Sequence, residues 1–88
     1  MDYDKLYQEH IGIDLRILNS KCEFLEIDKL YSEKGEFLGY TCLIQFKDHD
    51  MMSTACQPTL DLAIKVAALK SKGVEIKWKI LVITLKTD

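Results

Sequence analysis

The chain has 88 residues, of which 48% are hydrophobic and 30% are charged, and its formal net charge is −2. This size and composition exclude a multidomain protein and a disordered chain, and they predict a single domain over residues 1–88. The longest uninterrupted apolar run, residues 80–83, is too short to cross a bilayer. Three cysteines without a C-x-x-C pair suit a reducing compartment, so we expect a cytoplasmic protein. The sequence has no G-x-G-x-x-G, Walker, G-x-S-x-G or H-E-x-x-H motif, so we expect no cofactor.

The two signs of charge are distributed unevenly. Residues 1–57 hold six Lys or Arg against eleven Asp or Glu, whereas residues 58–88 hold six lysines against three acidic residues. Ordinary surface patterning produces such a difference, and so does a basic surface that meets an acidic partner. The candidate basic patch consists of Lys65, Lys72, Lys77 and Lys79.

The N-terminal segment fits two patterns. Residues 11–18, IGIDLRIL, alternate apolar and polar side chains as a strand does. A helical stripe is also present, formed by Tyr3, Tyr7, Ile11, Leu15 and Leu18. Because Gly12 destabilises a helix by about 1 kcal/mol, the sequence favours a helix over 3–10 and a strand over 11–18.

Residues 22–47 predict a β-hairpin. Two stretches rich in aromatic and branched side chains flank the turn SEKG, in which Gly35 supplies a positive φ. A two-residue loop at 34–35 and a three-residue loop at 33–35 both fit. Either loop places Cys22 opposite Phe46 or Lys47, so Cys22 and Cys42 are expected to be buried free thiols. Glu26 and Asp28 share one face of their strand and are expected to face solvent.

The segment DHDMMSTACQPT at 48–59 contains the residue types of a metal or thiol site. Asp48 and Asp50 would lie on the opposite side of an extended chain from His49, and the second ligand pair of a zinc site is missing, so we expect no metal. Cys56 precedes a predicted helix, whose dipole favours a thiolate, and His49 is the available base. No group orients this pair, and the segment is predicted to be a connecting loop.

Residues 58–73, PTLDLAIKVAALKSKG, predict a helix. Pro58 and Thr59 suit its first turn, Asp61 complements its positive end, and Gly73 suits the position after its last residue. Its apolar face is wide and contains alanines that allow close approach to a sheet.

The last segment, VEIKWKILVITLK at 74–86, predicts a strand. Val74, Ile76, Trp78, Ile80 and Val82 share one face, and on the other face charged residues give way to Leu81, Ile83 and Leu85. Either the N-terminal segment or another subunit must cover these three side chains. They form the candidate interface of a homodimer.

The run from Thr41 to Gly73 resembles small phage-encoded proteins of the ABA-sandwich kind. The resemblance covers about a third of the chain and consists of a strand, a polar loop and an alanine-rich helix, here with Pro58, Leu60, Ala63, Ala67, Ala68 and Leu69. It implies a phage or mobile-element origin and helices on both faces of a sheet. It implies no enzymatic role.

Together these patterns predict an α+β fold with an antiparallel sheet of three to four strands and a crossover helix, in the order α-β-β-β-α-β. The function expected is that of a non-catalytic interaction or regulatory module that binds other proteins and forms a homodimer. A nucleic-acid-binding accessory protein, using the four lysines, and a thiol-dependent enzyme at Cys56 are the alternatives.

Overall fold

A computed structural model describes residues 2–48 and 53–74 of the chain. It is an α+β fold with five regular elements and one short 3-10 helix. In chain order these are α1 (Tyr3–His10), η1 (Leu18–Lys21), β1 (Cys22–Tyr31), β2 (Phe37–Phe46), β3 (Ser53–Gln57) and α2 (Leu60–Ser71).

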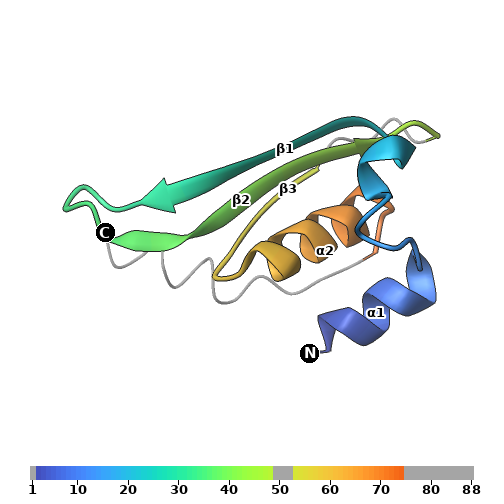
Figure 1. Ribbon diagram of the computed structural model, residues 1–88. Helices are drawn as coiled ribbons and strands as arrows, with labels where there is room; N and C mark the ends of the chain where they lie inside the picture. The colour runs from blue at the N-terminus through green and yellow to red at the C-terminus, as the bar shows by residue number, and fades with distance from the viewer. Residues whose placement is uncertain (1, 49–52, 75–88) are drawn as a thin grey trace.

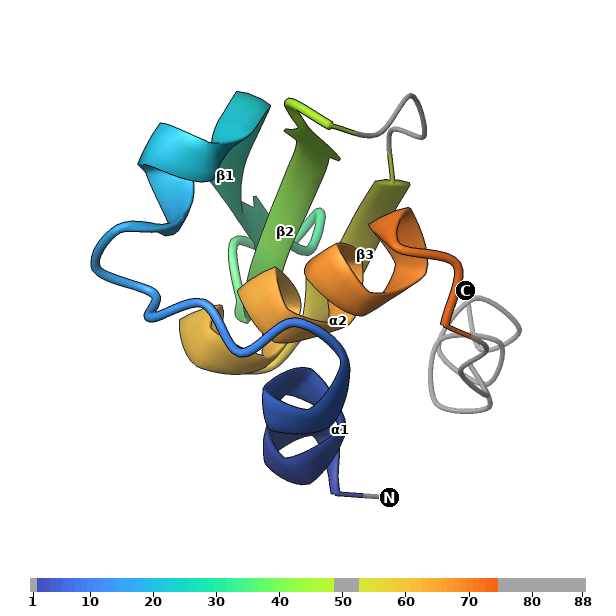
Figure 2. The same ribbon diagram turned by 90° about the vertical axis from the view of Figure 1, so that its right-hand side faces the viewer.

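The elements form three layers. The strands make one antiparallel sheet in the order β1-β2-β3. Helix α2 lies along one face of this sheet, and α1 packs on the far side of α2 (Figures 1 and 2). We call the sheet face that carries α2 the inner face and the opposite one the outer face. No described helix covers the outer face (Figure 1).

The middle position of α2 explains its composition. A helix that contacts neighbours on two sides needs apolar residues around most of its circumference. The three alanines among its fully buried apolar residues let backbones approach closely. These buried residues are Ala63, Val66, Ala67, Ala68 and Leu69. Tyr7 of α1 and Leu18 of η1 belong to the same core, as do Cys42, Ile44 and Phe46 of β2.

The ends of α2 agree closely with the predicted helix. Thr59 caps its start, accepting a hydrogen bond from the Leu62 amide at 3.3 Å. Gly73 has φ +83°, and the next amide, that of Val74, donates to the Leu69 carbonyl at 3.0 Å. This is the glycine-terminated helix end expected from the sequence. Pro58 and Thr59 precede the first turn and are not part of it.

The β1–β2 hairpin is confirmed, and its loop is the three-residue alternative. The Ser32 amide donates to the Glu36 carbonyl at 2.8 Å, which leaves residues 33–35 as the loop, with Gly35 at φ +85°. Cys22 lies opposite Phe46. The thiols of Cys22 and Cys42 are free and buried, as predicted.

The predicted strand at 11–18 is wrong. Residues 11–17 form turns and irregular chain, and η1 begins at Leu18. Gly12 has φ +68° and its amide donates to the Tyr7 carbonyl, so it ends α1 and redirects the chain. The helix predicted at 3–10 coincides with α1.

The connecting loop predicted at 48–59 is also wrong in part, because Ser53–Gln57 form β3. Thr41 lies opposite Cys56 and Cys42 lies opposite Ala55 in the β2–β3 ladder. The described order is therefore α-β-β-β-α, although its strands are not the three that were predicted before the helix. The predicted last strand lies outside the described residues.

Candidate protein interface at strand β1

Strand β1 stands at the edge of the sheet. It pairs with β2 on one side, and no described residue pairs with its other side. At ten residues it is twice as long as β3, which has five. A long edge strand exposes a row of backbone donors and acceptors and is a template for pairing with another chain.

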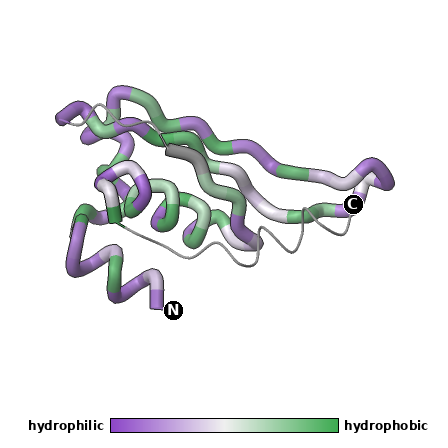
Figure 3. The backbone as a smooth tube through the Cα atoms, turned by 180° about the vertical axis from the view of Figure 1, so that it is seen from behind, coloured by the Kyte–Doolittle hydropathy of each residue, from purple (hydrophilic) through white to green (hydrophobic). Residues whose placement is uncertain are grey.

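Strand β1 carries large apolar side chains on both faces of the sheet. Residues opposite each other in a ladder point to the same side, and Cys42 of β2 is buried beneath α2. Ile27 therefore belongs to the inner face, where its side chain is 39% exposed. Phe24 and Leu30 belong to the outer face and are 40% and 38% exposed. Figure 3 shows hydrophobic and hydrophilic residues interspersed along this strand.

The position of α2 explains why the inner face of β1 is left open. The helix packs mainly against β2 and β3. Strand β3 ends at Gln57, opposite Tyr40, so the far end of the hairpin extends past the start of α2 (Figure 1). There the rings of Tyr31 and Tyr40 each meet that of Phe37 edge to face, with centroids 5.8 and 5.2 Å apart.

Two carboxylates occupy the centre of β1 on the outer face. Glu26 lies opposite Leu43 and Asp28 lies opposite Thr41, and both acidic residues are exposed, as the sequence predicted. Within the described residues neither forms an ion pair. Phe24 and Leu30 flank them on the same face, so two acidic side chains lie between two apolar ones along the outer face of β1.

The structure describes two lysines of the candidate basic patch: Lys65 lies on α2 and Lys72 directly follows its last residue. Both form ion pairs with carboxylates of this chain. Lys65 Nζ lies 2.6 Å from Asp4 Oδ1 and 3.0 Å from Asp61 Oδ2, and the hydrogen bond to Asp4 raises the pKa of Lys65. Lys72 Nζ lies 3.0 Å from Asp48 Oδ1 and 4.4 Å from the centre of the Phe46 ring. Lys77 and Lys79 lie outside the described residues.

The candidate thiol, Cys56, lies within β3 and not at the end of a helix. Its side chain is half-buried, and Ala55 beside it points to the inner face, so Cys56 belongs to the outer face. His49, its candidate partner, lies outside the described residues. Burial raises the pKa of the Cys22 thiol and raises that of Cys42 to about 11, so both remain neutral thiols.

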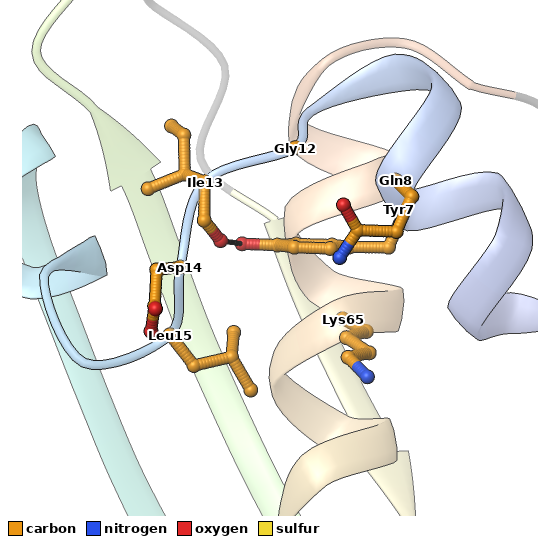
Figure 4. Close-up of a pocket in the computed structure, with 7 residues that line it drawn as sticks. All are labelled: Tyr7, Gln8, Gly12, Ile13, Asp14, Leu15 and Lys65. Atoms are coloured by element: carbon orange, nitrogen blue, oxygen red, sulfur yellow. Dashed lines mark hydrogen bonds between the residues drawn. The ribbon is translucent and has the colours of Figure 1, made fainter.

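A shallow hollow of about 480 Å³ lies between α1, the chain after it and α2 (Figure 4). The Tyr7 hydroxyl donates to the Ile13 carbonyl at 2.6 Å across it. Its two charged groups already have partners: Lys65 binds Asp4, and Asp14 binds Arg16, whose guanidinium lowers the pKa of that carboxyl to about 2. These contacts hold the N-terminal segment in place.

Within residues 2–48 and 53–74, no cluster of three or more His, Cys, Asp and Glu side chains has the arrangement of a metal site. In the same part of the chain, no helix has the length and apolar composition needed to span a membrane.

Sequence reasoning did not identify β1 as the exposed element, because the strand order that makes it an edge comes only from the fold. One signal was available in the residues themselves: CEFLEIDKLY carries large apolar side chains at both odd and even positions. A strand with apolar residues on both faces is usually covered on both.

Comparisons with protein-family models, with curated proteins and with solved structures find no match to this chain.

Proposed function

We propose that this protein is a non-catalytic interaction module that acts as a homodimer and uses the free edge of β1 as its contact surface. One observation carries the proposal: β1 has the length of a central strand and exposes apolar side chains on both faces, but within the described residues it is an edge strand. Pairing its edge with another chain satisfies its backbone groups and covers its apolar side chains.

The distribution of exposed apolar residues supports this surface. Of the eight large hydrophobic side chains that are exposed in the described part of the chain, four belong to β1: Phe24, Ile27, Leu30 and Tyr31. A short chain buries a smaller share of its surface than a long one, so covering such residues in a dimer adds to its stability. The candidate interface residues Leu81, Ile83 and Leu85 lie outside the described residues and remain part of the proposal, as residues of a segment that takes part in the same contact.

The alternatives receive less support from the described residues. A nucleic-acid surface needs accessible cations, and the amines of Lys65 and Lys72 are engaged with carboxylates. A catalytic thiol needs a base within hydrogen-bond reach, and no described residue supplies one to Cys56. Three free cysteines suit a cytoplasmic protein. The phage or mobile-element origin rests on the resemblance alone and is kept as a prediction.

Light scattering on the full chain at micromolar concentration tests the proposal. We expect a mass of about twice 10.2 kDa. The double variant Ile27→Ser/Leu30→Ser removes one apolar residue from each face of β1 and is expected to shift the chain towards monomer. Ile17→Ser is the matched control, because Ile17 is 51% exposed but lies outside β1. A wild-type mass near 10.2 kDa would end the proposal.

A further inference from the structure

We infer that the occupant of the β1 edge is the C-terminal segment of a second copy, with Lys77 and Lys79 of one chain beside Glu26 and Asp28 of the other. The inference rests on the proposed homodimer and names the segment that makes the contact. Three arguments support it: the charges are complementary, the apolar positions coincide, and the chain's own segment cannot reach the site.

The charges are complementary in number and in spacing. Glu26 and Asp28 are two residues apart on one face of β1 and have no ion-pair partner among the described residues. Lys77 and Lys79 are also two residues apart in the sequence. When a segment pairs as a strand, residues two apart share one side at this same spacing. Neighbouring strands place such side chains directly beside each other, where opposite charges attract.

In this register, apolar residues of the C-terminal segment also lie beside apolar residues of β1, whether the two strands are parallel or antiparallel. With the two lysines beside the two carboxylates, the next residue on that side, Leu81, comes beside Leu30 in a parallel pairing or beside Phe24 in an antiparallel one. Trp78 comes beside Ile27 on the inner face in both directions. The segment thus covers exposed apolar residues on both faces of β1, which are the residues that need a partner.

The segment that fills this edge cannot come from the same chain in this register. Helix α2 packs mainly against β2 and β3, and its last turn lies on the β3 side of the sheet, away from β1 (Figure 2). From β3 to a position outside β1 is three strand spacings, about 14 Å. The three residues from Val74 to Lys77 span at most about 10 Å. A second copy has no such restriction, and two copies can exchange their segments reciprocally.

Charge reversal in the full chain tests the exchange. We expect Glu26→Lys/Asp28→Lys to weaken the dimer at least about tenfold, since each attraction becomes a repulsion, and Lys77→Glu/Lys79→Glu to do the same. Mixing the two variants restores opposite charges at both contacts, so the mixture is expected to give a mass of about twice 10.2 kDa although each variant alone gives a monomer. Glu33→Lys/Glu36→Lys makes the same charge change in and beside the hairpin loop and is expected to leave the dimer unchanged.

The outcomes separate the inference from the proposed function. A wild-type monomer removes the proposed homodimer, and the inference with it. A wild-type dimer that both reversals leave intact overturns the inference alone. Monomeric variants that stay monomeric when mixed also overturn it, because in that case the two sets of charges do not face each other between chains. Circular dichroism of each variant shows whether it is folded, and the mixing result depends on both variants being folded.

Discussion

A Cβ atom placed on Gly39 of β2 would lie only 2.5 Å from the backbone carbonyl oxygen of Gln57, the last residue of β3. Gly39 also has φ +152°, a backbone conformation that side chains rarely adopt. The contact brings the end of β3 close to β2, immediately before Pro58 and the start of α2. Helix α2 begins three residues after Gln57, at Leu60, and packs mainly against β2 and β3.

Gly39→Ala is expected to lower the free energy of unfolding by roughly 2–4 kcal/mol, through strain in φ and through the clash with a backbone atom that cannot rotate away. Urea denaturation followed by circular dichroism measures the change. Gly35→Ala is the matched control: φ at Gly35 is +85°, but no atom lies within 4 Å of the added Cβ, so a loss of about 1 kcal/mol is expected. Equal losses in the two variants would contradict the close approach.

Tyr7→Phe is expected to lower the free energy of unfolding by about 1–2 kcal/mol. The Tyr7 ring is 1% exposed, and its hydroxyl donates to the Ile13 carbonyl at 2.6 Å, so the substitution leaves that carbonyl without its donor. Tyr31→Phe removes a hydroxyl from a ring that is 53% exposed and is expected to change little. Thermal unfolding of both variants gives the comparison. An unaffected Tyr7→Phe protein would show that this hydrogen bond does not hold the segment after α1.

Cys42 predicts a dependence of stability on alkaline pH. Burial raises the pKa of its thiol from 9.0 to about 11 in the folded protein. Below pH 9 the thiol is protonated in the folded and in the unfolded protein, and its full contribution to stability is present. As pH rises from 9 through 11, the thiol ionises first in the unfolded chain, which stabilises the unfolded state, so this contribution is lost.

The measurement compares the wild type with Cys42→Ala. The stability advantage of the wild type is expected to shrink by about 2–3 kcal/mol between pH 8 and pH 11. Denaturant unfolding at several pH values follows this difference. The contributions of the other titrating groups to it largely cancel, because both proteins contain those groups. A constant difference across this range would show that Cys42 titrates as it does in the unfolded chain.

The parts of the fold that the sequence predicted are those with strong local patterns. The helix at 58–73 and the hairpin at 22–47 each combine a regular apolar period with a glycine where the chain needs positive φ. Their boundaries moved by only a few residues. The α+β class followed from these two elements.

The errors came from segments whose structure depends on distant neighbours. Strand β3 has the sequence STACQ, which lacks large apolar side chains, because a five-residue strand beneath α2 needs only a small residue, Ala55, pointing inward. Residues 11–18 have the alternation of a strand, but here the chain turns at Gly12 and again where Asp14 binds Arg16. Side-chain alternation does not determine whether a neighbouring strand is present to pair with.

The candidate interface was only partly visible in the sequence. The acidic pair, the basic C-terminal third and the expectation of a dimer were all present in the residues. The edge position of β1 was not, because it depends on β3 pairing with the other side of β2. With the edge known, the separated charges become two halves of one proposed contact.

Amide hydrogen exchange along β1 tests the claim of a paired edge most directly. In an edge strand, alternate amides point away from the sheet and exchange freely, whereas in a central strand nearly all are protected. If β1 is paired in the dimer, the full chain at dimer-forming concentration protects consecutive amides from Phe24 to Leu30, and dilution releases alternate ones. Free exchange of alternate amides at every concentration would contradict the claim.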